Sequence, residues 1–476
     1  MSKKSVEDVV DDSTTSKEEV NKAKIVAKEL EKKKATEKNT EEAAVEAIEK
    51  EDKSRIQSDD EVYDPKPAKK PLTPTEVKHK KRKKIIIISI IVVLLLAGIA
   101  TACYFIFFYK PAPENVQEEE IVVVEKPKYY SKLSGLEIEN ESINSMPTYC
   151  IQIPNGLDGA RPQTGLDSAA VIFEAIAEAG ITRFAAIFQN PQNSVIGPIR
   201  SLRSYYLDWD TPFDCTIVHA GGSNDAIAAV RSGGYRDLTE SYDYMWRDQS
   251  SYWAPNNLMT SPALLAEFNK ANGYNTSNPV TFSRLLPNEA TEKKNAAFKS
   301  AGIDPETNEQ IKKTTEGDNT EGENTETVTP LVESIDVNFG YVDAFNVHYQ
   351  YNRQTNSYLR SYQNGQAHLV YSCPDGLTQP SPKTTCGDAK QLSPSAIVVI
   401  KVDEYLDSDR YHQVVQTIGT GTAYIFQNGT STKGVWVKNN KSDQITFKSD
   451  SGEAISFTPG QIFISAIPNG TGSVKY

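Results

Sequence analysis

Hydrophobic and polar positions change character abruptly along this chain. Residues 1–84 are rich in Lys, Glu, Ala, Ser and Thr and contain one aromatic residue, Tyr63, so they lack the apolar surface that folding requires. Residues 85–108 (IIIISIIVVLLLAGIATACYFIFF) carry no charge. At about 1.5 Å per residue, a helix of that length crosses the roughly 30 Å hydrocarbon core of a bilayer. We therefore expect a disordered charged tail followed by one transmembrane helix.

The remaining sequence alternates between structured and low-complexity stretches. We expect a stalk at 109–130 and a first globular domain at 131–300. A linker at 301–330, with a biased mixture of Thr, Glu, Gly and Asn, separates it from a second domain at 331–476. The pattern predicts two globular domains on the same side of the membrane.

The first domain mixes helical and strand periods. Residues 171–189 (VIFEAIAEAGITRFAAIFQ) fit either a helix or two strands joined by a tight Ala-Gly turn. In the second interpretation Ile176 faces Arg183, and Glu174, Glu178 and Arg183 share one face as an ion-pair cluster.

Three later stretches complete the pattern of the first domain. Pro198 begins a predicted helix that carries Arg200 and Arg203 on one face. Residues 215–219 (CTIVH) form a predicted strand, and the following helix starts with Ser223 or Asn224 as its N-cap. Strands that alternate with helices indicate an α+β or α/β fold.

The second domain has a different pattern. Short runs of alternating polar and apolar residues, rich in β-branched and aromatic side chains, are separated by Gly, Asn, Asp or Pro throughout residues 331–476. We expect this domain to be mostly β.

Charge is distributed unevenly and sets the expected topology. Residues 1–84 hold 22 Lys and Arg against 20 Asp and Glu, which leaves 29 against 43 in the remainder of a chain with net charge -12. An acidic exterior repels phosphates, so we expect no nucleic-acid partner. The cationic run at 78–84 (KHKKRKK) directly precedes the apolar stretch, and such flanks stay in the cytoplasm. The chain is expected to be single-pass in the cell membrane, its N-terminus cytoplasmic and its C-terminal domains extracytoplasmic.

Two features near the membrane leave alternatives open. The sequence Ala100-Thr-Ala-Cys103 resembles a lipoprotein signal, but the apolar run continues to Phe108 instead of becoming polar at the cysteine. The tail is either a docking segment for a cytoplasmic partner or a solvated spacer.

Four of the five cysteines follow the apolar run. Cys373 and Cys386 bracket a Pro- and Ser-rich loop, and we expect them to form a disulfide, which stabilises by roughly 3 kcal/mol on the chain-entropy model. Cys150 and Cys215 lie in apolar stretches, where buried free thiols fit equally well, so their pairing stays open. The spacing of Cys and His predicts no metal site, and no nucleotide-cofactor fingerprint is present.

Arginines are the main candidates for ligand binding. The motif Gly-Pro-x-Arg-Ser-x-Arg at 197–203 combines a predicted helix N-terminus with two guanidinium groups, which suits an anion. We expect an anionic or carbohydrate-bearing cell-wall ligand at Arg161, Arg183, Arg200, Ser201, Arg203, Arg247 and Asn257. The competing interpretation is that these arginines pair with nearby carboxylates to hold the domain together.

Two other functions compete with ligand binding. An envelope hydrolase would use His219 and Ser223, where a strand ends in a Gly-rich turn, together with Glu174. Ser223 is equally explained as a helix N-cap. An adaptor that links envelope proteins would instead present an exposed apolar patch on the second domain.

Several motifs resemble the YerB-like bacterial lipoproteins. They are Gly180-Ile-Thr-Arg-Phe184, Gly197-Pro-Ile-Arg-Ser-Leu-Arg203, His219-Ala-Gly-Gly-Ser223, Ala254-Pro-Asn-Asn-Leu258 and, in the second domain, Tyr358-Leu-Arg360. The resemblance covers roughly 131–290 and 331–470. It implies attachment to the outer face of the cytoplasmic membrane and implies no particular reaction. Here a membrane span replaces the lipid anchor, and Asn256 stands where the family is expected to carry His.

Overall fold

The computed structural model describes residues 74–107, 127–311 and 328–476. The predicted tail up to residue 73, most of the stalk and the centre of the linker lie outside these residues. Those residues from 127 onward that are described belong to one compact unit, and the helix before it belongs to a separate unit.

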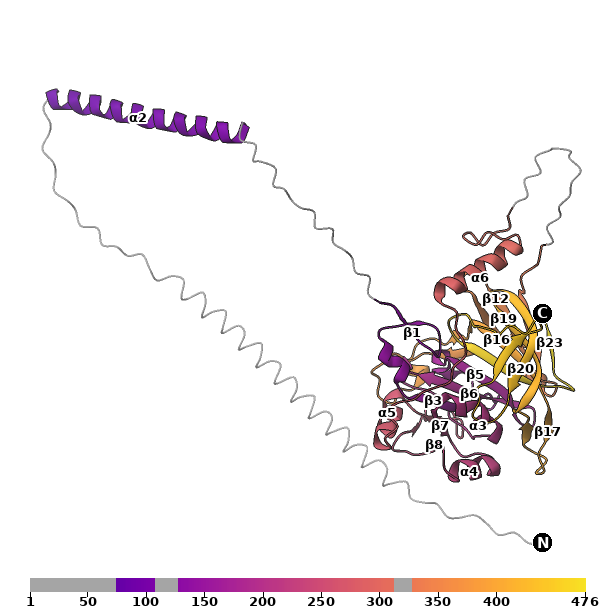
Figure 1. Ribbon diagram of the computed structural model, residues 1–476. Coiled ribbons are helices and arrows are strands. Elements are labelled where there is room, and N and C mark those ends of the chain that lie inside the picture. Colours follow the sequence, from indigo (N-terminus) through magenta and orange to yellow (C-terminus); the bar gives the residue numbers. More distant parts are fainter. Residues whose placement is uncertain (1–73, 108–126, 312–327) are drawn as a thin grey trace, which may run out of the picture. The chain divides into compact units, whose positions relative to one another are not determined.

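Helix α2 spans Pro74–Phe107 and contains residues 85–107 of the predicted apolar stretch (Figure 1). It starts before Ile85 and includes the cationic residues 78–84 that precede that stretch. The part from Ile88 to Phe107 is long and apolar enough to cross a membrane by length and composition.

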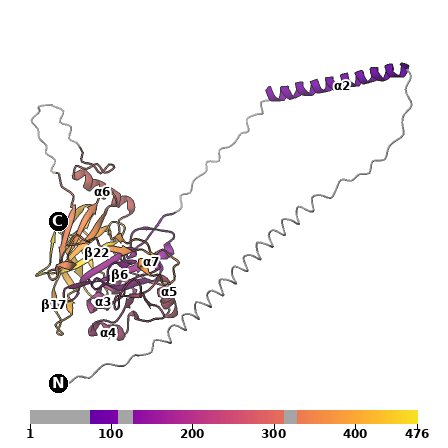
Figure 2. The ribbon, with the colours of Figure 1, turned by 180° about the vertical axis from the view of Figure 1, so that it is seen from behind.

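The second unit is mostly β with some helices, and its largest element is a ten-stranded mixed sheet (Figures 1 and 2). The strand order is β21-β20-β19-β16-β22-β5-β6-β3-β7-β8. Five strands precede the predicted linker, namely β3 (Thr148–Pro154), β5 (Val171–Glu178), β6 (Ile181–Gln189), β7 (Cys215–His219) and β8 (Arg236–Thr239). Five follow it, namely β16 (Ala396–Val402), β19 (Gly419–Gln427), β20 (Thr430–Lys438), β21 (Thr446–Ser449) and β22 (Ile462–Pro468).

The two groups of strands meet where β22 pairs in parallel with β5. Strand β22 also pairs in parallel with β16, so it lies between strands from opposite sides of the linker. The predicted boundary at 301–330 thus separates the segments in sequence, while in space their strands form one sheet.

A four-stranded sheet covers part of one face of the large sheet. Its order is β13-β12-β11-β23, with β11 (Ser334–Asn338), β12 (Val347–Asn352), β13 (Ser357–Tyr362) and β23 (Ser473–Lys475). Alternate residues of the central strands point to opposite faces and are buried on both, as in Ile172 and Phe173 of β5. Because both faces are covered, the sequences of these strands are continuous apolar runs and do not alternate between polar and apolar residues.

Helices lie around the sheets. The α3 helix (Ser204–Asp210) packs Tyr206 and Trp209 against the face opposite to the four-stranded sheet. In both ribbon views α6 (Pro287–Ser300) lies at one end of the unit and α4 (Asn224–Arg231) at the other (Figures 1 and 2). The remaining α-helices of the described part of this unit are α5 (Pro262–Ala271) and the short α7 (Pro382–Thr385).

Small sheets of two or three short strands complete the unit. They are β1 (Tyr129–Tyr130) with β2 (Glu137–Ile138), β9 (Trp246–Arg247) with β10 (Leu258–Met259), β17 (Glu404–Leu406) with β18 (Gln413–Val415), and β4 (Gln163–Thr164) with β14 (Leu369–Tyr371) and β15 (Lys390–Gln391). The β4–β14 pairing is parallel and again joins residues from both sides of the linker.

Residues 171–189 form two antiparallel strands joined at Ala179 and Gly180, as the strand interpretation predicted. The predicted register is wrong, because Ile176 pairs with Thr182 and Ala175 pairs with Arg183. A β-bulge between Ile176 and Glu178 shifts the pairing, and sequence alternation alone does not reveal such a bulge.

The helix predicted from Pro198 begins later, at Ser204. Residues 198–203 contain no helix, and Arg203 is the extended N-cap residue of α3. The Gly197–Pro198 peptide bond is cis. Arg200 and Arg203 therefore do not share a helical face. The predicted strand at 215–219 and the helix with Ser223 at its N-cap position are confirmed, but the Ser223 side chain makes no capping hydrogen bond.

Both disulfides are present in the second unit. Cys373 and Cys386 are bonded, as predicted, and Cys150 is bonded to Cys215, a pair that the sequence left open. The remaining cysteine, Cys103, lies in α2 and is free.

Candidate functional site

Two of the predicted ligand-binding arginines converge on one buried carboxylate. Arg183 Nη2 lies 2.7 Å from Glu178 Oε1, and Arg203 Nη2 lies 2.5 Å from Glu178 Oε2. Burial alone would raise the pKa of Glu178, but the two guanidinium groups hold it below its usual value. Arg183 also donates to the carbonyl oxygen of Ser201 at 3.0 Å. These contacts fit the competing interpretation, in which both arginines stabilise the domain.

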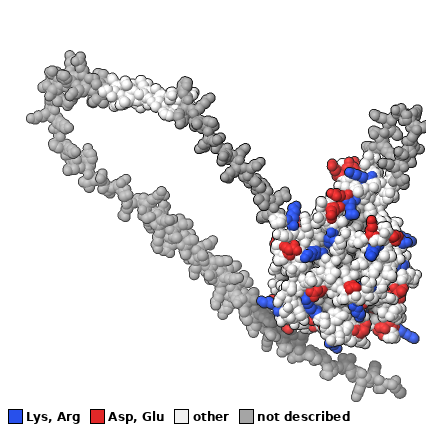
Figure 3. All heavy atoms as spheres, viewed as in Figure 1, with Lys and Arg blue, Asp and Glu red and all other residues white. Residues whose placement is uncertain are grey.

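The other predicted residues are dispersed around this pair. Arg247 contacts Glu240 and donates to Asn257 Oδ1 at 2.9 Å, so the structure brings these two predicted residues together. Arg200 is half-buried, and its backbone N–H donates to the carbonyl oxygen of Gln152 at 2.9 Å. On the face seen in Figure 3, basic and acidic side chains are interspersed over the second unit.

The three residues expected for a hydrolase, His219, Ser223 and Glu174, lie in different surroundings. His219 Nε2 lies 2.7 Å from Asp237 Oδ1, and His219 Nδ1 lies 2.7 Å from the carbonyl oxygen of Gly221. A general base needs one ring nitrogen directed at the nucleophile. Both nitrogens of His219 have other partners, and Glu174 is in contact with Arg360 instead. Among the described residues, no hydrogen bond joins His219 to Ser223.

A buried polar network that the sequence did not predict lies between the two segments of the unit. Arg360 Nη2 lies 3.0 Å from both oxygens of Glu174, and both side chains are completely buried. Arg360 also donates from Nη1 to Tyr349 Oη at 2.6 Å and from Nε to His368 Nδ1 at 2.8 Å. Burial and the nearby arginine charges lower the pKa of His368 well below its usual value, so its ring is neutral and accepts this hydrogen bond.

The network continues from His368 to the surface. His368 Nε2 lies 2.9 Å from Gln163 Oε1, and Gln163 Nε2 donates to the carbonyl oxygen of Pro154 at 3.0 Å. Asn155 donates to Thr182 Oγ1 at 2.7 Å and accepts from Tyr362 at 3.0 Å. At the rim, Arg161 Nε donates to Asn155 Oδ1 at 2.9 Å. Arg161 is thus the one predicted ligand-binding residue that contacts this network directly.

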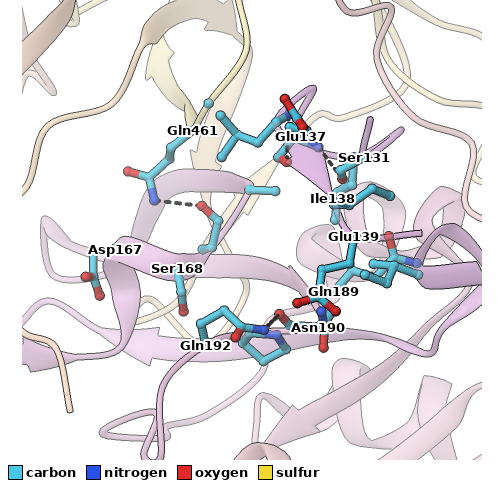
Figure 4. Close-up of a pocket in the computed structure, with 18 residues that line it drawn as sticks. Ser131, Glu137, Ile138, Glu139, Asp167, Ser168, Gln189, Asn190, Gln192 and Gln461 are labelled. Carbon is cyan, nitrogen blue, oxygen red and sulfur yellow. Dashed lines mark hydrogen bonds between the residues drawn. The ribbon is translucent and has the colours of Figure 1, made fainter. Parts of the chain in front are cut away.

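A cleft of about 590 Å³ lies elsewhere on the unit (Figure 4). Its walls come from the β1–β2 segment, from the short η2 helix (Leu166–Ser168), from the end of β6 with the residues that follow, and from Gly460 and Gln461. Figure 4 shows Gln461, Asp167 and Ser168 on one side and Ser131, Glu137 and Glu139 on the other, with Asn190 and Gln192 below them in this view. None of these residues was predicted from the sequence.

Hydrogen bonds fix several walls of this cleft. Gln461 Nε2 donates to the carbonyl oxygens of Leu166 and Ala169, at 3.0 Å and 2.8 Å, and so joins β22 to the η2 segment. Gln189 donates to the carbonyl oxygen of Met146 at 2.8 Å, while its side-chain oxygen is buried without a hydrogen-bond partner among the described residues. Amide side chains that are held in place by hydrogen bonds, and that still have a free acceptor oxygen, can fix the orientation of a polar ligand.

The lining of the cleft is acidic and amide-rich. It contains three carboxylates, from Glu137, Glu139 and Asp167, and no Lys or Arg among its described residues. Apolar side chains, including Leu136 and Ile138, lie beside these polar groups. In the described part of the chain, no group of three or more His, Cys, Asp or Glu side chains is placed to hold a metal ion.

Comparison with known proteins places this architecture in a defined class. Residues 133–275 match the N-terminal domain, and residues 335–464 the C-terminal domain, of the protein of unknown function DUF3048. These two segments together form more than half of the chain and correspond to the strands on either side of the linker. The chain is therefore a protein of the two-part DUF3048 class.

One relative identifies the family more closely. The YerB protein of Bacillus subtilis (strain 168), which is designated a lipoprotein, is 26% identical over 351 residues, covering 72% of this chain and 87% of YerB. The crystal structure of YerB from Bacillus subtilis has the same fold, with a TM-score of 0.53 at 22% identity, covering 73% of this chain and 100% of that structure. The chain belongs to the YerB-like two-domain family.

Proposed function

We propose that this protein is a membrane-anchored extracytoplasmic protein that binds a carbohydrate-bearing ligand of the cell envelope in the cleft between Glu137, Asp167 and Gln461. The cleft itself carries the proposal. Its carboxylates and amides are hydrogen-bonding partners for hydroxyl groups, and adjacent Leu136 and Ile138 offer apolar surface to a sugar ring. Its acidic lining disfavours an anionic group at this site, because like charges repel.

Three observations support the proposed location. The apolar part of α2 is long enough to span a bilayer and follows a cationic run, which favours a cytoplasmic N-terminus. The compact unit contains two disulfides, which persist in oxidising surroundings outside the cytoplasm. The relative YerB is designated a lipoprotein, which is a membrane-anchored class. Protease added to intact protoplasts should digest residues 127–476 and spare an N-terminal epitope tag, and a protected C-terminal unit would contradict this topology.

The ligand is tested with neutral cell-wall oligosaccharides and thermal unfolding. Replacing both Glu137 and Glu139 by Gln keeps their size but exchanges charged acceptors for neutral amides, which form weaker hydrogen bonds, so the ligand-induced rise in the melting temperature should become smaller. The matched control is Glu141→Gln, which makes the same change on the same segment outside the cleft. An unchanged response of the double variant, or no response of the parent protein to any neutral saccharide, would count against the proposal.

An adaptor function is the second candidate, and the β17–β18 hairpin favours it. Tyr405, Leu406 and Tyr411 on this hairpin are 59%, 49% and 54% exposed. Exposed apolar side chains close together in the chain are typical of contact surfaces. Crosslinking in whole cells with a photoreactive residue at 405 should capture a defined envelope protein if the adaptor function holds, and the Leu406→Ser variant should lose that product.

A further inference from the structure

The buried polar network contains more positive than negative charge. Arg360 and Arg161 are both guanidinium groups and remain protonated at neutral pH. Glu174 supplies one carboxylate, which Arg360 contacts through both oxygens. His368 is neutral, as described above. Within the described residues, one positive charge in this region, that of Arg161, is therefore left without a carboxylate in direct contact.

Contacts of Arg161 hold the guanidinium in place without neutralising it. Its Nε donates to the backbone oxygen of Asn155 at 3.0 Å and to Asn155 Oδ1 at 2.9 Å. Its Cζ lies 3.6 Å from the centre of the Tyr362 ring and 5.3 Å from that of Phe345. By contrast, four other arginines described above are paired with carboxylates, namely Arg183, Arg203, Arg247 and Arg360.

One terminal nitrogen of Arg161 lacks an acceptor. Nη2 is removed from water and has no hydrogen-bond partner among the described residues. Leaving a charged donor buried and unpaired is costly, and the cost disappears when an acceptor binds. Burial also lowers the pKa of Arg161. Both observations indicate a group that is more stable with a bound anion.

Arg161 lies at the partly exposed edge of the network, although its Nη2 atom is itself covered. The residue as a whole is only partly buried. Trp253 is 81% exposed and lies beside Gly159, two residues before Arg161, where a Cβ added to the glycine would be 4.0 Å from Trp253 Cδ1. Asn256 donates to the carbonyl oxygen of Asp158 at 3.0 Å and ties the Trp253 loop to this segment.

We propose that Arg161 is the centre of an oxyanion-binding site, in which a carboxylate or phosphate group of a ligand accepts hydrogen bonds from the guanidinium that Tyr362 and Asn155 hold in position. A guanidinium fork matches the paired oxygens of both groups. The site is separate from the cleft and does not depend on the proposed carbohydrate ligand.

The test uses the full-length protein in detergent micelles and inorganic phosphate as the probe. At constant ionic strength set with chloride, the parent protein should broaden the ³¹P signal of phosphate in a saturable way, and acetate should compete. The Arg161→Gln variant should lose this broadening. The Arg161→Lys variant keeps the charge but not the fork, and it should bind phosphate about tenfold more weakly. Arg353→Gln is the matched control, because it removes a surface arginine that is paired with Glu333.

Each possible outcome either supports or overturns the proposed oxyanion-binding site at Arg161. Saturable broadening that Arg161→Gln abolishes and Arg353→Gln preserves supports the site, and competition by acetate extends it to carboxylates. No saturable broadening by the parent protein, or equal broadening by folded Arg161→Gln, overturns it. Should Arg161→Gln fail to fold, unweakened binding by Arg161→Lys overturns it instead. The cleft variants at Glu137 and Glu139 should bind phosphate like the parent, so the two proposals fail independently.

Discussion

The guanidinium of Arg360 lies 3.0 Å from both carboxylate oxygens of Glu174, although the two residues are 186 positions apart in the chain. Glu174 is in β5, in the first family segment, and Arg360 is in β13, in the second. Both side chains are completely buried. This contact therefore fixes the position of the four-stranded sheet on the large sheet. Any other position would leave a buried charge unpaired.

Replacing Glu174 with Gln should destabilise the protein strongly. The change leaves Arg360 buried without its counter-charge, and breaking a buried pair in this way costs about 3–5 kcal/mol. The measurement is chemical denaturation of residues 127–476, which contain the compact unit. The matched control is Glu333→Gln, which breaks the partly exposed pair with Arg353 and should cost less than about 1 kcal/mol. Equal losses in the two variants would contradict the structural role of Arg360.

Stability should fall as the pH rises, in part because of Glu404. Burial raises the pKa of Glu404 from 4.5 to about 8, and both carboxyl oxygens lack a hydrogen-bond partner among the described residues. The folded protein thus keeps a proton that the unfolded chain releases near pH 4.5. The free energy of unfolding should therefore decrease between about pH 4.5 and pH 8.

The Glu404→Gln variant isolates this contribution. Because the amide does not titrate, the melting temperature of the variant should fall less between pH 5 and pH 8 than that of the parent, and should exceed it at pH 8. Other titrating groups contribute equally to parent and variant, so the difference between their melting temperatures reports on Glu404 alone. Parallel pH profiles would show that Glu404 is not buried as described.

The two disulfides should contribute unequally to stability. They close loops with sequence separations of 65 for Cys150–Cys215 and 13 for Cys373–Cys386. On the chain-entropy model these loops correspond to about 4 and about 3 kcal/mol. Replacing both cysteines of each pair with Ala, followed by denaturation, should rank the pairs in that order. Alkylation of the unreduced denatured chain should modify Cys103 and leave the other four cysteines intact.

Trp253 should account for most of the tryptophan fluorescence that a neutral quencher can reach. It is 81% exposed, whereas Trp209, Trp246 and Trp436 are at most 9% exposed. Acrylamide quenching of residues 127–476 should become much weaker in the Trp253→Phe variant. The Trp436→Phe variant should retain the quenching of the parent. If the two variants behave alike, the loop that carries Trp253 is packed differently.

Local patterns predicted local structure well. The turn at Ala179 and Gly180, the strand at 215–219 and the start of the helix after Ser223 all follow from short-range periodicity and turn chemistry. The Glu178–Arg183 ion pair was also predicted, since both residues lie near the same turn. The register was wrong because a bulge adds a residue that alternation does not reveal.

These local patterns did not predict contacts between residues that are distant in the sequence. Glu174 was expected to join Arg183, but its partner is Arg360 from another sheet, and no spacing in the sequence connects them. The cleft is similarly assembled from segments as distant as Ser131 and Gln461, and its residues are ordinary surface types. The Arg360 motif, Tyr358-Leu-Arg360, was noticed through family resemblance, which carried a signal that periodicity lacked.

The position of β22 has a consequence for how the molecule is made. Strand β5 finds its neighbour β22 only after the intervening chain has been synthesised, since Glu174 and Ser465 are 291 residues apart. At the usual rate of synthesis of about 5–20 residues per second, one edge of this apolar strand stays unpaired for roughly 15 to 60 seconds. During that interval the open edge offers a template for any other strand. Until β22 has been made, this edge of β5 is therefore the part of the large sheet that is most open to incorrect pairing.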